Sequence, residues 1–521
     1  MQSTKASADL EVSRTEFKAT NTAAHPVHGH HHTQVQASHL YREDADGNVL
    51  GRVLIPQPTN DPHDPLTWST WRKHMAFASV SFYVLLSNYS LTAMTPGLAG
   101  VIEDFGITAT ESGYLVSFQI LTLGLGNLFW IPLALKYGKR PVLVISSLLF
   151  FVTCIWAAKA QSYGSLLASR LVTGFAGSAS EAMGPAVVAD LYFLHERATK
   201  TGFYTFMIGG GSALGGIFGG LVVNASNQWR WVFWMCSILN GTCFLLIAIF
   251  YEETNFARPD EDEAGDDTNS SGTHLTRSNY NFVHSLSLLR WHDRETSIWL
   301  YFYRPLQLLL YPLVLYAALC YGVTLGWVVF QLTANATYFP ALYNFSPLGV
   351  GNLYIANLVG AVLGCLFSGP LCDWLIAVVT RRRGGYFEPE YRLYLMAAPL
   401  LFGPAGLLMW GFGLQYQLHW AVPAVGSGIS YGVLCAVPNI GMTYVVDAHR
   451  PVAGEAMTSL TAFKNTFAFG LCFAVYPWIL KDGFAHVSGY QTLIEGILFL
   501  LTVPLFFYGK KIRLYFSKFD V

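Results

Sequence analysis

Two charged residues share one face of an apolar stretch over residues 163–190. Arg170, Gly174, Gly177 and Glu181 are spaced i, i+4, i+7 and i+11, which places all four on one side of a helix. At a rise of about 1.5 Å per residue, Arg170 and Glu181 lie roughly 16 Å apart along the axis, too far to pair with each other. Each therefore needs its own partner, which could be another helix, water or a substrate.

Glu181 is the residue best suited to proton chemistry. It falls near the middle of its apolar stretch, where the charged form of a carboxyl is costly and the neutral acid is favoured. This position makes Glu181 a candidate proton carrier; the alternative is a structural ion pair with another helix. A second deep charge, Lys464, is followed by Asn465 and could answer the carboxylate of Glu181 or meet an anionic substrate.

The composition of the chain predicts the elements that carry these residues. Of 521 residues, 53% are hydrophobic and only 12% are charged, whereas soluble proteins carry about 25% charged residues. A soluble enzyme is therefore excluded. The formal net charge of −1 gives no support for a nucleic-acid partner, which requires clustered excess Lys and Arg.

Apolar windows predict an all-α membrane protein with twelve transmembrane helices, because each crossing needs about 20 apolar residues. The predicted spans are 75–97, 112–135, 141–160, 163–190, 199–223, 230–251, 308–336, 348–371, 391–413, 420–445, 454–480 and 489–508. The predicted domains are a disordered cytosolic tail (1–73), six helices (74–251), an acidic cytosolic loop (252–306), six further helices (307–509) and a cytosolic C-terminal tail (510–521).

Two features stand in the polar segments. The N-terminal tail holds a histidine tract, His28, His30, His31 and His32, which could bind a metal but lacks fixed geometry. The central loop is predicted to end in a short amphipathic helix around 282–300.

Basic residues orient the chain. Cytosolic flanks of membrane spans retain Lys and Arg, and placing both termini in the cytosol puts 26 of the 31 basic residues on that side. Three N-glycosylation triplets, at Asn224, Asn335 and Asn344, then fall in outer loops, in agreement with this orientation. We expect a multi-pass protein of the plasma membrane.

Motifs for ATP use and zinc hydrolysis are absent from the sequence. No G-x-x-x-x-G-K-[ST] or H-E-x-x-H element occurs, so we expect neither an enzyme nor a cofactor, and the energy for any transport must come from a gradient. In the fifth predicted span, Gly211, Gly215 and Gly219 repeat every four residues, as do Gly216 and Gly220. This pattern indicates either close helix packing or a pliable helix at a moving interface.

Several segments resemble the signatures of one transporter family. Residues 133–141, Leu-Ala-Leu-Lys-Tyr-Gly-Lys-Arg-Pro, resemble the loop between the second and third spans of the major facilitator superfamily, with Leu135 where the family has Asp. Arg170, Gly174 and Gly177 are similar to its fourth-span Arg and Gly motif. The glycines of the fifth span are similar to its antiporter motif, with Gly216 where Pro is usual. The likeness covers roughly 60–510 and extends to fungal members of the drug:proton antiporter branch, which is related to polyamine and cation carriers.

This resemblance implies two pseudo-symmetric six-helix bundles around a central cavity that opens alternately to each side. It implies proton coupling through Arg170 and Glu181. The implied substrate-binding residues are Asn88, Tyr89, Gln119, Glu181, Trp327, Gln331, Tyr431, Asn439 and Lys464. The implied gating-loop residues are Lys136, Gly138, Lys139, Arg140, Asp190, Glu196, Arg197, Asp373 and Arg381, with Asp190 standing in for the missing acid.

Three functions follow from these residues. The first is a monomeric secondary transporter that exports a small organic molecule against proton entry. The second is proton-driven uptake of an organic cation such as a polyamine. The third is a nutrient sensor built on a transporter scaffold. The expected partners are a small-molecule substrate, protons and the lipid bilayer, with no nucleic acid.

Overall fold

The computed structural model describes residues 41–43, 49–52, 64–256, 298–382, 388–448 and 453–516. The histidine tract and the predicted helix start at 282 lie outside these described residues. The chain divides into two units, Met1–Val53 and Leu54–Val521. In the first unit, β1 (Tyr41–Glu43) and β2 (Val49–Arg52) pair as antiparallel strands, with Tyr41 opposite Arg52. No strands were predicted from the sequence.

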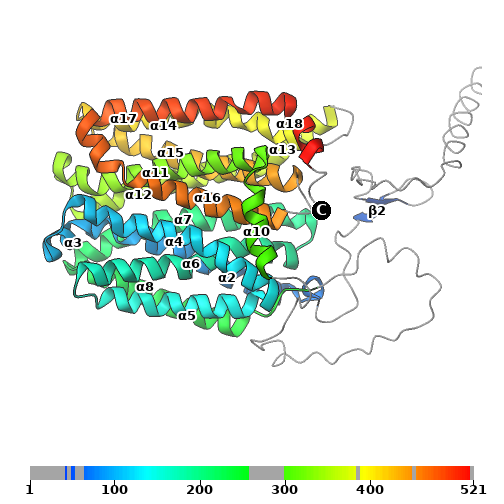
Figure 1. Ribbon diagram of the computed structural model, residues 1–521, viewed down its shortest axis with the longest axis horizontal. Coiled ribbons are helices and arrows are strands. Elements are labelled where there is room, and N and C mark those ends of the chain that lie inside the picture. Colours follow the sequence, from blue (N-terminus) through cyan, green and yellow to red (C-terminus); the bar gives the residue numbers. More distant parts are fainter. Residues whose placement is uncertain are drawn as a thin grey trace, which may run out of the picture. The chain divides into compact units, whose positions relative to one another are not determined.

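The second unit is helical, and a helix lies over each predicted span (Figure 1). Its elements up to residue 256 are η2 (Pro65–Thr67), α2 (Thr70–Ala93), η3 (Thr95–Gly97), α3 (Leu98–Phe105), α4 (Ala109–Tyr137), α5 (Lys139–Ala158), α6 (Tyr163–Leu191), α7 (Leu194–Ser226) and α8 (Arg230–Phe250). We call these elements the first half.

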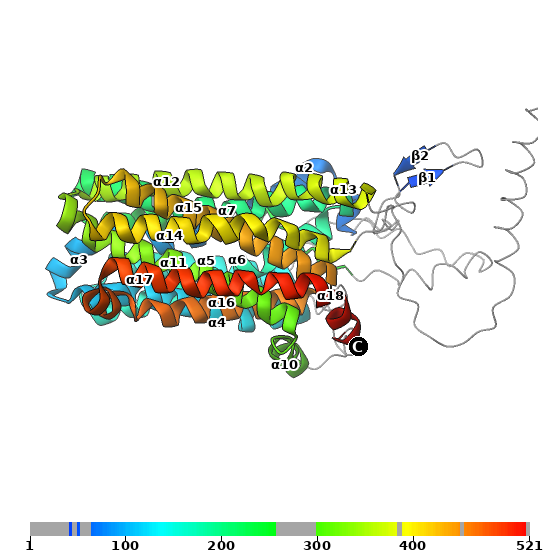
Figure 2. The same cartoon turned by 90° about the horizontal axis from the view of Figure 1, so that it is seen from above.

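The elements from residue 298 onward form the second half. They are α10 (Ile298–Leu308), α11 (Pro312–Tyr343), α12 (Pro347–Leu366), η4 (Phe367–Leu371), α13 (Cys372–Arg382), η5 (Pro389–Met396), α14 (Ala397–Gln415), α15 (Ala421–Ala448), α16 (Ala453–Cys472), α17 (Val475–Leu500) and α18 (Thr502–Phe516). The long helices run side by side, and the short α10 crosses them (Figures 1 and 2).

Some helix ends differ from the predicted spans for local reasons. α16 ends at Cys472 rather than near 480, because α17 begins at Val475 and then bends at Gly483. Gly483 has a φ of 74°, a left-handed conformation that favours glycine. The same holds at the tight junction between α4 and α5, where Gly138 has a φ of 104°.

Each half packs within itself and meets the other along two seams. In the first half α4 packs on α6, α2 on α7 and α5 on α8; in the second half α12 packs on α15, α14 on α15 and α17, and α11 on α16. The seams between the halves are formed by α7 against α12 and by α4 against α16. Helices α6 and α16, which carry Glu181 and Lys464, therefore lie close to or at a seam.

Glycines on two faces of α7 let it pack closely against one helix of each half. Gly211, Gly215 and Gly219 lie directly on the backbone of α2, so a Cβ at any of them would collide with a carbonyl oxygen of that helix. Gly216 and Gly220 lie on the other side of α7, against the Tyr354 ring and the backbone of α12. Close approach of helix backbones is what small residues permit in lipid, and here one such stripe lies on a seam.

The outer surface of the second unit suits a lipid environment. Large side chains such as Ile238, Leu363 and Leu401 are 68%, 62% and 68% exposed, whereas water-soluble proteins rarely expose apolar surface on this scale. Within the described residues, nine helical segments are long and apolar enough to cross a membrane. These are features of a multi-pass membrane protein.

Three long helices, α2, α6 and α16, are outside that set of nine. They carry the polar residues on which the sequence analysis concentrated, including Asn88 on α2, Glu181 on α6 and Lys464 on α16. All three side chains are buried inside the protein. Their helices are less apolar because they line the interior rather than because they face water.

Candidate functional site

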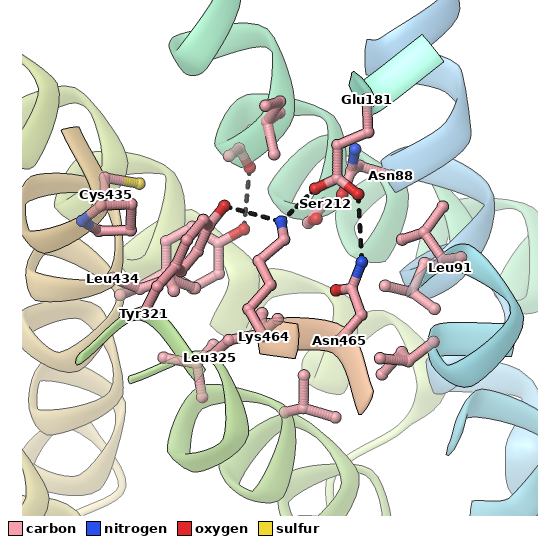
Figure 3. Close-up of a pocket in the computed structure, with 18 of the residues that line it drawn as sticks. Asn88, Leu91, Glu181, Ser212, Tyr321, Leu325, Leu434, Cys435, Lys464 and Asn465 are labelled. Carbon is pink, nitrogen blue, oxygen red and sulfur yellow. Dashed lines mark hydrogen bonds and ion pairs between the residues drawn. The ribbon is translucent and has the colours of Figure 1, made fainter. Parts of the chain in front are cut away.

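A cavity of about 70 Å³ lies between the two halves, which is enough space to hold water molecules. Helices α2, α4, α6 and α7 contribute one side, and α11, α15 and α16 contribute the other (Figure 3). It is lined by Asn88, Leu91, Thr92, Ile120, Leu123, Glu181, Thr205, Ile208, Gly209, Ser212, Tyr321, Leu325, Val328, Val329, Leu332, Tyr431, Leu434, Cys435, Pro438, Lys464 and Asn465.

An ion pair across the seam occupies this cavity. The ammonium group of Lys464 donates to Oε1 of Glu181, and each side chain is only 3% exposed. Asn465 donates through Nδ2 to the other carboxylate oxygen of Glu181 at 3.3 Å. Lys464 also donates to the Tyr321 hydroxyl at 2.8 Å, and its Nζ lies 4.2 Å from the centre of that ring. Figure 3 shows these four side chains converging from α6, α11 and α16.

The Glu181–Lys464 pair stabilises the structure only while both side chains are charged. Two charges so far from water lose their hydration, and only their mutual attraction and added hydrogen bonds offset that cost. Removing one partner of such a pair typically costs about 3–5 kcal/mol, because the other charge is left buried and uncompensated. Any event that neutralises Glu181, such as protonation, therefore weakens the link between α6 and α16.

Small residues position Glu181 on α6. Gly184 leaves room for the Tyr204 ring of α7, whose hydroxyl donates to the carbonyls of Ser180 and Glu181. Gly177 lies against Ser87 of α2. The turn that carries the carboxylate is thus fixed between α2 and α7, with its side chain directed at the second half.

Asn88 and Tyr431, two predicted substrate-binding residues, also line the cavity. Asn88 donates to the carbonyl of Val84 in its own helix, at 3.1 Å. The Tyr431 hydroxyl donates to the carbonyl of Gly209 on α7 at 2.9 Å, which adds a further hydrogen bond between the halves.

Five other predicted substrate-binding residues do not line this cavity. Three donate to nearby serines: Gln119 to Ser90 at 3.2 Å, Gln331 to Ser430 at 3.3 Å, and Asn439 to Ser368 at 3.1 Å. The Tyr89 hydroxyl contacts the Met235 sulfur at 3.4 Å. The Trp327 indole lies in an apolar layer of the second half, 2% exposed.

Several lining residues were not predicted, and Tyr321 is the most important of them. Tyr321, Leu325, Val328 and Leu332 follow i, i+4, i+7 and i+11 on α11, the same spacing that singled out α6. That spacing was readable in the sequence. It carried no weight because α11 is apolar on all sides, so no face of it stands out.

Arg170 is buried away from the cavity and has no carboxylate partner among the described residues. Its guanidinium donates to the carbonyls of Ser90 at 3.1 Å, of Leu91 at 3.3 Å and of Leu115 at 3.3 Å. α2 ends at Ala93, so the carbonyls of its last turn have no partner within the helix. Arg170 therefore caps α2, where a cation is also favoured by the helix dipole.

The predicted gating-loop residues gather at the opposite end of the helices from Arg170. Lys139 pairs with Asp190, and the Arg140 guanidinium donates to the carbonyls of Tyr251 and Ala248, the latter at 2.9 Å. Arg197 donates to the carbonyls of Tyr192 at 3.0 Å and Ala189 at 2.7 Å.

Glu253 supplies an acid at this end that the sequence analysis did not single out. Its carboxylate accepts from the backbone N–H groups of Lys139 and Arg140, both at 3.1 Å, at the start of α5. An anion is favoured at a helix N-terminus. The neighbouring Glu252 binds Arg72 at 2.8 Å and so ties α2 to the end of α8.

Tyr192, just beyond α6, also belongs to this end. Burial raises the pKa of its phenol to about 12, so the hydroxyl stays protonated. It hydrogen bonds Nδ1 of His74 at 2.8 Å. Of the remaining predicted loop residues, Lys136 lies in the last turn of α4 and Glu196 in the first turn of α7, whereas the side chains of Asp373 and Arg381 are outside the described residues.

One glycosylation prediction needs correction. Asn335 was expected in an outer loop, but it lies inside α11, is 4% exposed, and its Oδ1 accepts from the Trp410 indole N–H at 2.8 Å. A glycosyltransferase cannot reach it in the folded chain. Asn224 and Asn344 are exposed near the ends of α7 and α11.

Ser430 lies in a G-x-S-x-G sequence, the pattern that surrounds the nucleophilic serine of some hydrolases. Gly428, Ser430 and Gly432 match G-x-S-x-G, but that motif activates serine on a strand-to-helix turn, and here it is inside α15. The Ser430 hydroxyl donates to the carbonyl of Gly426 at 3.1 Å. Ser430 is therefore a packing residue.

Comparison with known proteins identifies a family. The model of the Major Facilitator Superfamily matches residues 80–477. Protein HOL1 of Saccharomyces cerevisiae is 26% identical over 549 aligned residues, which cover 91% of this chain and 92% of that protein. A protein of Aspergillus flavus named probable efflux pump mfs2 is 28% identical over 403 residues, which cover 77% of this chain and 93% of that protein.

Among solved structures, the proton:xylose symporter XylE of E. coli is similar with a TM-score of 0.59 and 14% identity, over 87% of this chain and 97% of that chain. At this identity the likeness concerns the fold alone.

Proposed function

The chain belongs to the Major Facilitator Superfamily, and from this membership we propose that it is a secondary active transporter that exports a small organic molecule in exchange for protons. The resemblance noted in the sequence is thus confirmed at the level of the superfamily. The drug:proton antiporter branch, the direction and the coupling ion are parts of the proposal.

We propose that α2, α6 and α16 cross the membrane together with the nine more apolar segments, giving twelve spans in two bundles. Their buried polar residues face other helices and therefore do not contact lipid, where polar groups would be costly. Both termini are proposed to lie in the cytosol of a monomer in the plasma membrane, with the end that holds Lys139, Asp190 and Glu253 as the cytosolic gate.

The observation that carries the proposal is the Glu181–Lys464 pair. It joins the two halves in a cavity that both halves line, Glu181 from the first half and Lys464 from the second. Alternating access requires the halves to separate first on one side and then on the other. A proton on Glu181 removes the attraction to Lys464 and frees the cavity, which couples proton binding to movement of the halves.

Export is the favoured direction because the relative named probable efflux pump mfs2 covers most of this chain. A second candidate, uptake of an organic cation, is favoured by the cavity itself. Glu181 and the Tyr321 ring already hold a primary ammonium, that of Lys464. A ligand that carries an amine could take the same place.

The test is flux in proteoliposomes that contain the purified full-length chain, with an imposed pH gradient. Compounds that raise the thermal unfolding temperature are chosen as probes, since a ligand that binds only the folded state stabilises it. Proton-dependent efflux of such a compound supports the proposal, and proton-dependent uptake supports the second candidate. Binding without any flux would leave only the sensor.

The role of Glu181 has its own test. Glu181→Gln mimics the protonated acid, so flux in this variant is expected to be slow and to lose its dependence on pH. Glu103→Gln, which removes an exposed carboxyl of α3, is the matched control. Flux in Glu181→Gln with unchanged rate and pH dependence would end the proton-carrier proposal.

A further inference from the structure

A second buried acid, Glu495, lies outside the central cavity. It is on α17, is 3% exposed, and faces α14 and α11. On α14, Gly403 makes room for it: a Cβ there would lie 2.5 Å from Oε1 of Glu495. The absence of a side chain at Gly403 lets the carboxyl rest against the backbone of α14.

Within the described residues, no cation and no hydrogen-bond donor acts on the Glu495 carboxyl. The groups that face it can be named element by element. α14 carries no titratable side chain, and α17 carries none within one turn of Glu495. α11 presents the Cys320 thiol, and Tyr316 one turn earlier is engaged with Thr502. The Phe499 ring, one turn after Glu495 on α17, also lies beside Gly403.

Two other buried side chains on α17 and α11 have polar atoms without hydrogen-bond partners. Gln491 is one turn before Glu495 on the same face of α17, is 0% exposed, and neither its amide nitrogen nor its amide oxygen has a hydrogen bond. The indole N–H of Trp327, two turns beyond Cys320 on α11, is likewise unpaired. Buried polar atoms are rarely left without partners, and the unpaired Gln491 amide one turn from the Glu495 carboxyl points to a polar ligand or proton there.

Glu181 and Glu495 are both buried but have different surroundings. Glu181 has an ammonium and an amide to compensate its charge. Glu495 has neither, and an uncompensated carboxylate in an apolar place is far less favourable than the neutral acid. A metal cation would need several oxygen ligands, more than the Glu495 carboxyl and the nearby Gln491 amide oxygen supply.

We propose that Glu495 is a second proton-binding site, which holds its proton in this conformation and exchanges it when α11, α14 and α17 shift against one another. The proton site stands by itself, and its use in transport rests on the proposed function.

One turn of α11 connects the two acids. Cys320 faces Glu495, and the hydroxyl oxygen of the next residue, Tyr321, accepts a hydrogen bond from the ammonium of Lys464. A change at Glu495 that moves this turn also moves the Tyr321 contact with the central ion pair.

Infrared spectroscopy of the purified full-length chain in lipid nanodiscs tests the site without any substrate. A protonated carboxyl has a C=O stretching band that a carboxylate lacks. We expect this band near neutral pH in the wild type, its loss in Glu495→Gln, and its retention in Glu103→Gln, whose carboxyl is exposed. Unchanged bands in Glu495→Gln would overturn the proposal.

Two further measurements keep the outcome clear. If Glu495→Gln does not fold, Glu495→Asp retains an acid and is expected to move the band to a new position; a band that stays in place overturns the assignment. Loss of the wild-type band on adding sodium at constant pH would mean that a metal cation replaces the proton, which also overturns it. Because no flux is measured, failure here is distinguishable from failure of the proposed transport function.

Discussion

Arg170 and Lys464 are both basic residues buried inside membrane-length helices, and the structure satisfies them in opposite ways. Arg170 is held by backbone carbonyls of α2 and α4, all within the first half. Lys464 is held by a carboxylate from the other half and by the hydroxyl of Tyr321. A carbonyl cannot be protonated at ordinary pH, whereas a carboxylate can.

This difference separates a fixed charge from a switchable one. Arg170 joins helices of the first half, which move together if each half moves as a rigid body. No carboxylate of the described residues contacts Arg170. Lys464 spans the seam, so its partner changes when the halves separate. The comparison leads us to expect that Arg170 supports the first half and that Lys464 reports on the state of Glu181.

The largest expected effect is that of removing one member of the central pair. Lys464→Met leaves the Glu181 carboxylate buried without a cation, which costs about 3–5 kcal/mol of unfolding free energy, and flux is lost. The double variant Glu181→Gln with Lys464→Met removes both charges, so much of that stability should return. Thermal unfolding of both variants measures this, and a double variant no more stable than Lys464→Met would contradict the pairing.

Substitution of Arg170 is expected to cost a comparable amount and to resist any such rescue. Arg170→Met leaves the last-turn carbonyls of α2 without a donor, at about 1–3 kcal/mol for each buried polar group left unsatisfied. Arg170→Lys should recover little, because one ammonium cannot reach carbonyls on both α2 and α4. Unfolding measurements of the two variants check this. If replacing a carboxylate by its amide restored the stability of Arg170→Met, Arg170 would have a carboxylate partner and would not differ from Lys464.

The sequence predicted the charges well and their surroundings poorly. Arg170, Glu181 and Lys464 stood out because a charge in an apolar stretch is costly wherever its helix points. The partners did not stand out, since they depend on how each helix is rotated about its axis. Tyr321 faces the cavity whereas Tyr89 and Trp327 do not, although all three lie in membrane-length helices.

Glu253 and Glu495 illustrate the same limit for acids. Glu253 follows a predicted span, and only the fold brings it to the first N–H groups of α5. Glu495 lies within the predicted span 489–508, yet its isolation depends on Gly403 of another helix. The periodicity of one segment predicts where a helix lies in the sequence. The partner of a residue on a second helix depends on how the two helices pack.

A smaller effect is expected from the hydroxyl that supports Lys464. Tyr321→Phe removes the 2.8 Å hydrogen bond to the ammonium but keeps the ring beside it. Bonds to charged groups are worth about 1.5–3 kcal/mol, compared with about 1 kcal/mol for neutral ones. The matched control is Tyr431→Phe, which removes a neutral bond to the Gly209 carbonyl. Unfolding free energies should fall more in Tyr321→Phe, and the reverse order would mean that the ammonium does not depend on Tyr321.

The smallest effect is expected at a pair with the same chemistry but a different environment. Lys510 pairs with Glu388 at 2.6 Å, and their side chains are 59% and 34% exposed, against 3% for both Lys464 and Glu181. Water already solvates the exposed pair, so Lys510→Ala should change the unfolding free energy by less than about 1 kcal/mol. Raising NaCl to about 1 M shortens the screening length to about 3 Å, which should abolish what difference remains. The cost of Lys464→Met should persist in the same salt, because ions do not reach its cavity. If both costs vanish together, the central pair is open to solvent and cannot act as a switch between two closed halves.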